Sequence, residues 1–166
     1  MEARWVVSQR YVDTDVDRAR WRSTANLRVW PSLQLGVEFN AVVEEVGPLV
    51  TWFLTTERER WPAVFAGTSS DRIGSPAGEQ SYYLTLAKHA PGWPISAYAA
   101  LNYSEWDEGF NVPFGATLDL WRGFSVQPMF DGDRTHLLLN YARSRATVSL
   151  LWVWLERPGI SVSIGF

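Results

Sequence analysis

The chain has 166 residues, of which 46% are hydrophobic and 20% charged, and its formal net charge at pH 7 is −3. This length suits one domain, and the slightly acidic balance argues against a nucleic-acid partner. A mean hydropathy of −0.14 and the lack of any long apolar run exclude a bundle of membrane helices. Ten Trp residues are many for a soluble domain of this size.

Short segments in which apolar and polar residues alternate follow one another along the whole chain. Leu35 and Val37 fall on one face of such a segment, and Gln34 and Glu38 on the other. A period of two is typical of β-strands, and no long segment keeps a helical period. The sequence predicts twelve strands, with ten as the alternative count: 3–12, 20–30, 33–44, 49–58, 63–71, 80–89, 94–103, 112–121, 124–131, 135–142, 146–155 and 159–166.

The connections between these segments fall into two classes. One class repeats about every thirty residues, the length of two membrane-spanning strands with turns, and contains Trp30-Pro31, Trp61-Pro62, Trp93-Pro94 and Trp121-Arg122-Gly123. Chance spacing among the ten Trp residues is the alternative. The other class is longer, more acidic and rich in Gly, Pro, Asp and Ser, as turns should be. Its longest members, near 72–79 and 104–111, are too short to form a plug.

The last strand places Ile160, Val162, Ile164 and Phe166 on one face, and the chain ends on the aromatic residue. This pattern resembles the terminal strand of bacterial outer-membrane β-barrels, which the outer-membrane assembly machinery recognises. The resemblance covers the whole chain and implies an all-β fold. The expected fold is a closed antiparallel up-and-down transmembrane β-barrel with short turns, forming a single domain over 1–166. Both termini should lie on the periplasmic side, and the lipid bilayer and the assembly machinery are the expected partners.

The resemblance implies a location in the bacterial outer membrane. An exported protein needs a signal peptide, and Met1-Glu2-Ala3-Arg4 supplies neither its basic region nor its apolar region. The outer-membrane location therefore requires that this sequence is the mature form, or the mature form with a start Met added. A soluble sandwich can also end on a strand, so the last strand alone does not decide the location.

The polar face of the predicted strands carries charges. We predict that the lumen is lined by Arg4, Arg10, Arg22, Arg28, Glu38, Glu44, Asp119, Asp131 and His136. The charges either form a basic wall opposite an acidic wall, or neutralise one another inside a narrow barrel. The aromatic residues expected at the membrane interface are Trp30, Trp61, Trp93, Trp121 and Phe166.

No motif predicts catalysis or a metal site. Asp131 and His136 flank an Asp-Gly hairpin turn and could face each other, but a third ligand is missing. The acidic segment from Asp13 to Asp17 fits a solvated turn better than a calcium loop. Twelve-stranded outer-membrane phospholipases pair a catalytic His with a Ser two residues later, and neither His89 nor His136 has that neighbour. We therefore expect no enzyme activity, no cofactor and no metal.

The function that these patterns favour is a narrow passive pore for small hydrophilic solutes or ions. Twelve strands enclose a lumen wider than side chains fill, since eight already suffice for a packed interior. Two alternatives stay open. One is a non-conducting structural or assembly barrel of the outer membrane. The other is a soluble, lipocalin-like barrel that binds an apolar ligand. The sequence does not determine which solute or ion is selected.

Overall fold

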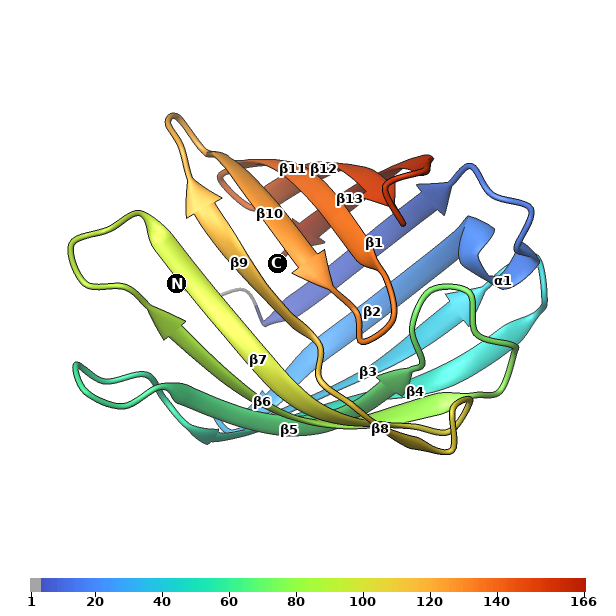
Figure 1. Cartoon of the computed structure of the whole chain (residues 1–166), viewed down its shortest axis with the longest axis horizontal. Helices are drawn as coiled ribbons and strands as arrows, with labels where there is room; N and C mark the ends of the chain where they lie inside the picture. Colours follow the sequence, from blue (N-terminus) through green and yellow to red (C-terminus); the bar gives the residue numbers. More distant parts are fainter. Residues whose placement is uncertain (1–3) are drawn as a thin grey trace.

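In the computed structural model, which describes residues 4–166, antiparallel strands follow one another around a closed barrel (Figure 1). The predicted start of the first strand at residue 3 lies outside the described residues. The elements are β1 (Trp5–Val12), α1 (Asp17–Arg20), β2 (Trp21–Trp30), β3 (Leu33–Asn40), β4 (Glu45–Thr55), β5 (Ala63–Ser70), β6 (Gln80–His89), β7 (Ile95–Ser104), β8 (Gly109–Asn111), β9 (Phe114–Asp119), β10 (Phe124–Phe130), β11 (Thr135–Arg143), β12 (Ala146–Val153) and β13 (Arg157–Gly165).

The first and last strands close the barrel. β1 pairs with β2 on one side and with β13 on the other, with Val7 opposite Ile164. At the chain ends the Phe166 amide donates to the carbonyl of Trp5 at 2.8 Å. Each remaining strand of the ring pairs with neighbours on both sides, and only the three-residue β8 pairs on one side, with β7, so the described barrel leaves no long unpaired edge. The predicted closed antiparallel up-and-down barrel is confirmed.

The eighth strand of the barrel is broken. The sequence predicts one strand over 112–121, whereas the structure has the short β8 and the separate β9, both paired with β7. The break falls at Pro113, which has no amide hydrogen to donate to the ladder. Its carbonyl still accepts from the amide of Ala100 at 2.8 Å. Twelve strands thus form the closed barrel, and β8 is an additional thirteenth.

The two ends of the barrel differ. The turns that contain Trp30, Trp61, Trp93 and Trp121 lie at one end, together with both described chain ends, on the left of Figure 1. We call this the Trp end. α1 and the connections 71–79, 105–108, 131–134 and 154–156 lie at the opposite end, which we call the loop end. The two predicted classes of connection therefore lie at opposite ends, whereas the side of a membrane that each faces stays a prediction.

Hydrophobic side chains face mainly outward. Among residues 4–166, only five hydrophobic residues are buried, whereas twelve polar or charged residues are buried and thirty-five large hydrophobic residues are exposed. A soluble domain buries its large apolar residues in a core. Here the buried apolar cluster is small, consists of Val12, Leu151 and Val153, and lies where β1 and β12 reach the loop end. No helix in the described part of the chain is long and apolar enough to span a membrane.

Glycines on the inner wall lie opposite large side chains. Gly67 in β5 faces Tyr83 in β6, and Gly115 in β9 faces Tyr98 in β7. A Cβ added to Gly67 would lie 2.6 Å from the Tyr83 hydroxyl oxygen and 2.0 Å from the carbonyl oxygen of Val50. The tyrosine rings thus cover the backbone of the glycines, as aromatic residues do beside strand glycines in other barrels. This arrangement keeps bulky rings against the wall and the lumen open.

We predict that Gly67→Ala destabilises the barrel, because the new methyl group collides with backbone and with the Tyr83 hydroxyl. The free energy of unfolding should fall by about 1–3 kcal/mol in equilibrium urea unfolding. Gly109→Ala is the matched control, because its nearest atom outside the adjacent residues, the Asp107 carbonyl oxygen, lies 3.6 Å from the added Cβ. Equal effects of the two substitutions would contradict the proposed packing of Tyr83 over Gly67.

Candidate functional site

The lumen contains two adjoining cavities. The first has a volume of about 250 Å³ and lies toward the loop end. We call it the arginine cavity, because its charged and titratable lining consists of Arg10, Arg18, Arg22, Arg72, Glu38, Asp71, Asp131 and His136. The second, which we call the tyrosine cavity, has a volume of about 450 Å³ and is lined by Tyr83 and Tyr98. Arg72 and Asp131 line both cavities, so the two adjoin within one lumen.

Glu38 is the most enclosed charge in the lumen, with 2% of its surface exposed. Arg22 on the adjacent β2 donates from Nε to Glu38 Oε2 at 2.7 Å. Ser70 Oγ donates to the same oxygen at 2.8 Å, and Asn40 Nδ2 donates to Oε1 at 2.9 Å. A buried carboxylate persists only when such partners replace its water. Both oxygens of Glu38 are therefore already engaged.

A second buried ion pair fastens α1 across the loop end. Arg18 of α1 donates from Nε to Glu45 Oε2 at 2.7 Å, and its Nη1 donates to Ser75 in the connection 71–79. The other Glu45 oxygen accepts from the amide of Gly78. Asn40 links this group to Glu38, because its Nδ2 also donates to Glu45 at 3.1 Å. One polar network thus ties α1 and the connection 71–79 to the barrel wall.

His136 and Asp131 form a third buried pair at the cavity. The amide of Trp154 donates to His136 Nδ1 at 3.1 Å, which places the ring proton on Nε2. His136 Nε2 lies 2.6 Å from Asp131 Oδ2 and donates to it. Burial raises the pKa of Asp131, but hydrogen bonds from His136 and from the amides of Arg134 and Asp133 lower it below its usual value. This carboxylate therefore stays ionised and fully engaged.

Arg72 reaches the lumen from the loop end. Its guanidinium forms an ion pair with Asp107 and lies 4.3 Å above the ring of Trp106. The hydrogen bonds from Arg72 lower the pKa of Asp107 below its usual value. Asp71, the residue before Arg72, accepts hydrogen bonds from Ser104 Oγ at 2.6 Å and from the Trp106 amide at 3.3 Å. The two connections at this end, 71–79 and 105–108, are thereby fixed to each other.

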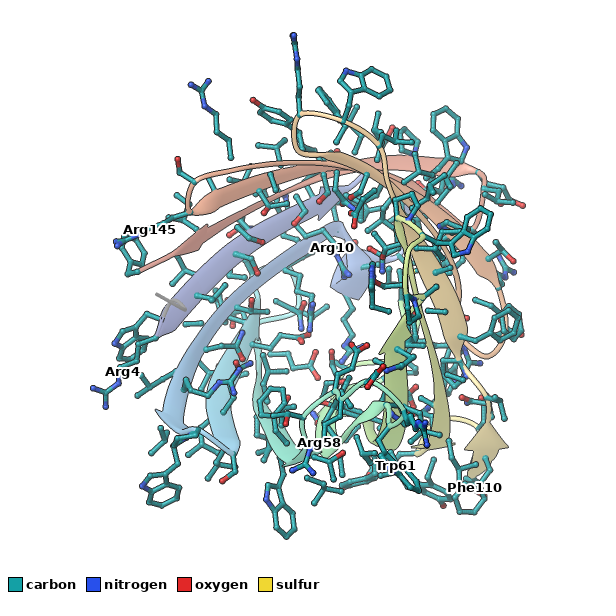
Figure 2. All side chains as sticks on the ribbon, turned by 90° about the vertical axis from the view of Figure 1, so that its left-hand side faces the viewer. Arg4, Arg10, Arg58, Trp61, Phe110 and Arg145 are labelled. Carbon is teal, nitrogen blue, oxygen red and sulfur yellow. The ribbon has the colours of Figure 1, made fainter. Side chains whose placement is uncertain are left out.

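Five of the predicted lumen residues come together at the arginine cavity. They are Arg10, Arg22, Glu38, Asp131 and His136. Figure 2, which looks into the barrel from the Trp end, shows Arg10 inside the ring of strands. Arg22 and Glu38 neutralise each other, as one of the two interpretations of the sequence predicts. Within the described residues, Arg10 has no carboxylate partner, so this neutralisation is incomplete.

The other four predicted lumen residues line neither cavity. Arg28 faces inward near the Trp end, where its guanidinium lies 4.0 Å from the Phe53 ring. Asp119 ends β9 at the Trp end and is exposed. Two positions are corrected by the structure. Arg4 precedes β1 at the exposed rim (Figure 2), and Glu44 lies in the turn after β3, which ends earlier than predicted.

All five predicted interface aromatics lie at the Trp end and are strongly exposed: Trp30, Trp61, Trp93, Trp121 and Phe166. Their exposed fractions run from 60% to 72%, which is high for such large apolar rings. The structure thus groups the residues of the thirty-residue repeat at one end of the barrel. Their contact with a membrane interface stays a prediction.

Sequence reasoning did not identify Arg18, Arg72 or Asp71 as lumen residues. Arg18 and Arg72 lie outside the strands, where no alternating pattern indicates the direction of a side chain. Both reach the cavity only because α1 and the connection 71–79 fold over the loop end. Asn40 differs from these residues, because the alternating pattern places it on the polar face with Glu38, and both are buried on the inward face of β3.

Among residues 4–166, no group of three or more His, Cys, Asp or Glu is arranged to hold a metal ion. The acidic segment after β1 instead pairs with nearby arginines. Asp15 lies 3.3 Å from Arg157 Nη2, and Asp17 lies 3.5 Å from Arg20 Nη2. These exposed pairs fit a solvated turn, the interpretation that the sequence favoured.

No family model matches the chain, and no curated protein matches it in sequence. The geometry of the barrel and of its lumen is therefore the basis on which a function can be proposed.

We predict that Glu38→Gln lowers the free energy of unfolding by about 3 kcal/mol, because Arg22 is left with an uncompensated charge. The lower end of the range for buried pairs applies, since 27% of the Arg22 side chain is exposed. Urea unfolding followed by Trp fluorescence measures the change. The double variant Glu38→Gln/Arg22→Met should lose less stability than Glu38→Gln alone. A double variant that loses as much would show that the ion pair is not the cause.

Proposed function

We propose that this chain is an integral β-barrel of the bacterial outer membrane whose lumen passes small hydrophilic solutes. The observation that carries the proposal is the inverted distribution of side chains. Leu35, Val37, Leu139 and Leu150 are exposed on the outer face, whereas Glu38 is buried on the inner face. In water such a large apolar surface would drive association. In a bilayer the same surface meets lipid tails, and the closed ring satisfies the backbone hydrogen bonds.

The outward residues are also sorted by height along the barrel, which supports the bilayer as partner. Aromatic residues cluster near both ends: Trp5, Trp30, Phe124 and Tyr141 toward the Trp end, and Tyr11, Trp21, Phe39, Tyr103, Phe114, Phe130 and Trp152 toward the loop end. Aliphatic residues lie between them: Leu35, Val37, Leu84, Leu101, Leu137, Leu139, Val148, Leu150, Ile160 and Val162. Outer-membrane barrels have the same order, an apolar band between two aromatic girdles.

The soluble alternative is less well supported. A lipocalin-like barrel needs an apolar interior for its ligand and a polar exterior for water. Here the interior holds Arg22, Glu38, Asn102 and His136, and the exterior holds the aliphatic band. Within residues 4–166, the cluster of fully buried apolar residues is small and lies at the loop end.

The case for a pore rests on the two adjoining cavities and on the charged side chains of the lumen. The tyrosine cavity lies on the Trp-end side of the arginine cavity, and Arg28 lies beyond both near the Trp end. Charged side chains that line a water-filled channel select the ions that pass through it. The non-conducting barrel is the competing function, and α1 favours it, since Arg18 fastens α1 across the loop end. As proposed, the barrel catalyses no reaction.

The proposal also assigns a partner to the last strand. β13 presents Ile160, Val162 and Ile164 outward and forms the seam with β1. Phe166 follows β13 with an exposed ring at the Trp end. These features suit recognition by the outer-membrane assembly machinery, which handles the terminal strand before the barrel closes. The Trp end would then face the periplasm.

We predict that Val162→Arg reduces insertion far more than Ser163→Arg. The two positions are adjacent in β13, but Val162 faces outward and Ser163 faces the lumen. An arginine facing lipid costs roughly 2–4 kcal/mol near the midplane, whereas an arginine facing the lumen meets water. The folded fraction is measured after refolding into liposomes, from the altered mobility of unboiled samples on a gel. Equal folded fractions, or a wild-type chain that is folded and monomeric without detergent, would contradict membrane insertion.

We predict that the wild-type barrel gives stable ohmic steps in a planar bilayer. Arg28→Glu should shift the selectivity toward cations, because it reverses a lumen charge on the Trp-end side of both cavities. Arg28→Lys is the matched control, since it keeps the charge and should leave the sign of selectivity unchanged. A barrel that inserts but never conducts would favour the non-conducting function, with the loop end closed by α1.

A further inference from the structure

We propose that the arginine cavity binds a small oxyanion, a solute that carries a phosphate, sulfate or carboxylate group. The proposal rests on the proposed function, because it names the chemical class of solute that the lumen recognises. The observation that carries it is an imbalance of hydrogen-bonding groups. The carboxylates around the cavity all accept hydrogen bonds from other groups. Several N–H groups of the cavity arginines are therefore left without an acceptor.

Three buried guanidinium nitrogens have no hydrogen-bond partner within the described residues. They are Nε of Arg10, Nη2 of Arg18 and Nε of Arg72. The Arg18 side chain is 7% exposed and that of Arg72 is 10% exposed, so neither group relies on bulk water. All three residues line the arginine cavity. A buried charged donor without a partner is costly, and native structures rarely keep one without a reason.

The acidic residues of the cavity do not accept hydrogen bonds from these three nitrogens. Both oxygens of Glu38 accept from Arg22, Ser70 or Asn40. One oxygen of Asp131 accepts from His136 and the other from two backbone amides.

Asp71 is occupied in the same way, since Oδ1 accepts from the Arg72 amide and Oδ2 from Ser104 and the Trp106 amide. The carboxylates of the cavity are therefore engaged with other donors. Asp133 Oδ2 lies 3.9 Å from Arg72 Nε, which is an ion-pair contact but too long for a hydrogen bond. The acceptor that completes the three arginines therefore comes, in this proposal, from outside the chain.

The arginines are held in place without the ligand. Glu38 fixes Arg22 and Glu45 fixes Arg18, while Arg72 is fixed by Asp107 and by stacking on Trp106. These contacts use some N–H groups of each guanidinium and leave others directed elsewhere. Side chains that are ordered in advance lose little entropy on binding, which strengthens the binding of a ligand that fits.

The guanidinium geometry decides the class of ligand. A planar guanidinium presents N–H groups that match the oxygens of phosphate or carboxylate groups, and such charge-assisted bonds are the strong ones. A cation is disfavoured, because the cavity oxygens are already engaged. A volume of about 250 Å³ admits a small solute but not a polymer chain. Because the cavity is inside the barrel, the oxyanion comes from the lumen rather than from a lipid headgroup.

Arg10 offers the clearest test, because removing it breaks no ion pair or hydrogen bond of its side chain among the described residues. Arg10→Met should fold, since it removes an uncompensated charge from the interior. The experiment titrates inorganic phosphate into the full chain refolded in an uncharged detergent, at constant ionic strength set by chloride. Isothermal titration calorimetry should show saturable binding to the wild type, and Arg10→Met should bind at least tenfold more weakly.

Two controls keep the result interpretable. Arg145→Gln should bind phosphate like the wild type, because Arg145 is exposed in the turn after β11 (Figure 2). Arg10→Lys keeps the charge but loses the planar donor set, and its affinity should fall between those of the wild type and Arg10→Met. Phosphate should also raise the melting temperature of the wild type but not that of Arg10→Met.

Different experimental results would overturn the oxyanion site and the membrane barrel. A barrel with heat-modifiable mobility that shows no saturable phosphate binding would overturn the oxyanion site and leave the membrane proposal standing. Unchanged affinity in Arg10→Met would overturn the site as well. A wild-type chain that binds phosphate in plain buffer, folded and monomeric, would instead retain the site and overturn the membrane barrel.

Discussion

The pairing of β1 with β13 is the constraint on which the rest of the structure depends. A sheet that is polar on one face and apolar on the other can be buried on only one of them, and its two outer edges would attract other chains. Seven residue pairs, from Val6 with Gly165 to Val12 with Gly159, join the first strand to the last. Closure removes both edges and separates an inner from an outer surface. The distribution of side chains is meaningful only because that boundary exists.

Closure also explains why the interior is organised by hydrogen bonds rather than by apolar packing. Short inner side chains and the glycine–tyrosine pairs keep the wall thin, so that cavities remain between opposite sides of the barrel. Charges that point into such a space lose part of their water and need partners. Glu38 forms an ion pair with Arg22, and Glu45 forms one with Arg18 that binds α1 to the barrel wall. Guanidinium nitrogens of Arg10, Arg18 and Arg72, which line the cavity, are left without a hydrogen-bond partner among the described residues.

The loop end gives the lumen its asymmetry. A small apolar cluster lies beneath the loop end and consists of Val12, Leu151 and Val153. Ile73 and Trp154 pack against this apolar base. α1 and the connection 71–79 lie over this base and are joined through Arg18, so they cover part of the lumen at the loop end. A solute that enters from the Trp end would pass the tyrosine cavity before it reaches the arginines.

The sequence alone determined the features that depend on local periodicity and on turn chemistry. The alternation in β3, β7 and β13 needs no knowledge of a partner strand, because successive side chains of any strand point to opposite faces. Turns rich in Pro, Gly and Trp mark the strand ends. The sequence therefore predicted the number of strands in the barrel and the location of both termini at the same end. The tertiary structure decided the rest. The break at Pro113 depends on which groups of β7 lie opposite it, and the placement of Glu44 depends on where β3 stops pairing with β4. Arg18 and Arg72 reach the cavity through folded connections, whose direction no two-residue period encodes. A binding site inside a barrel is made by residues far apart in the chain, and only closure brings them together.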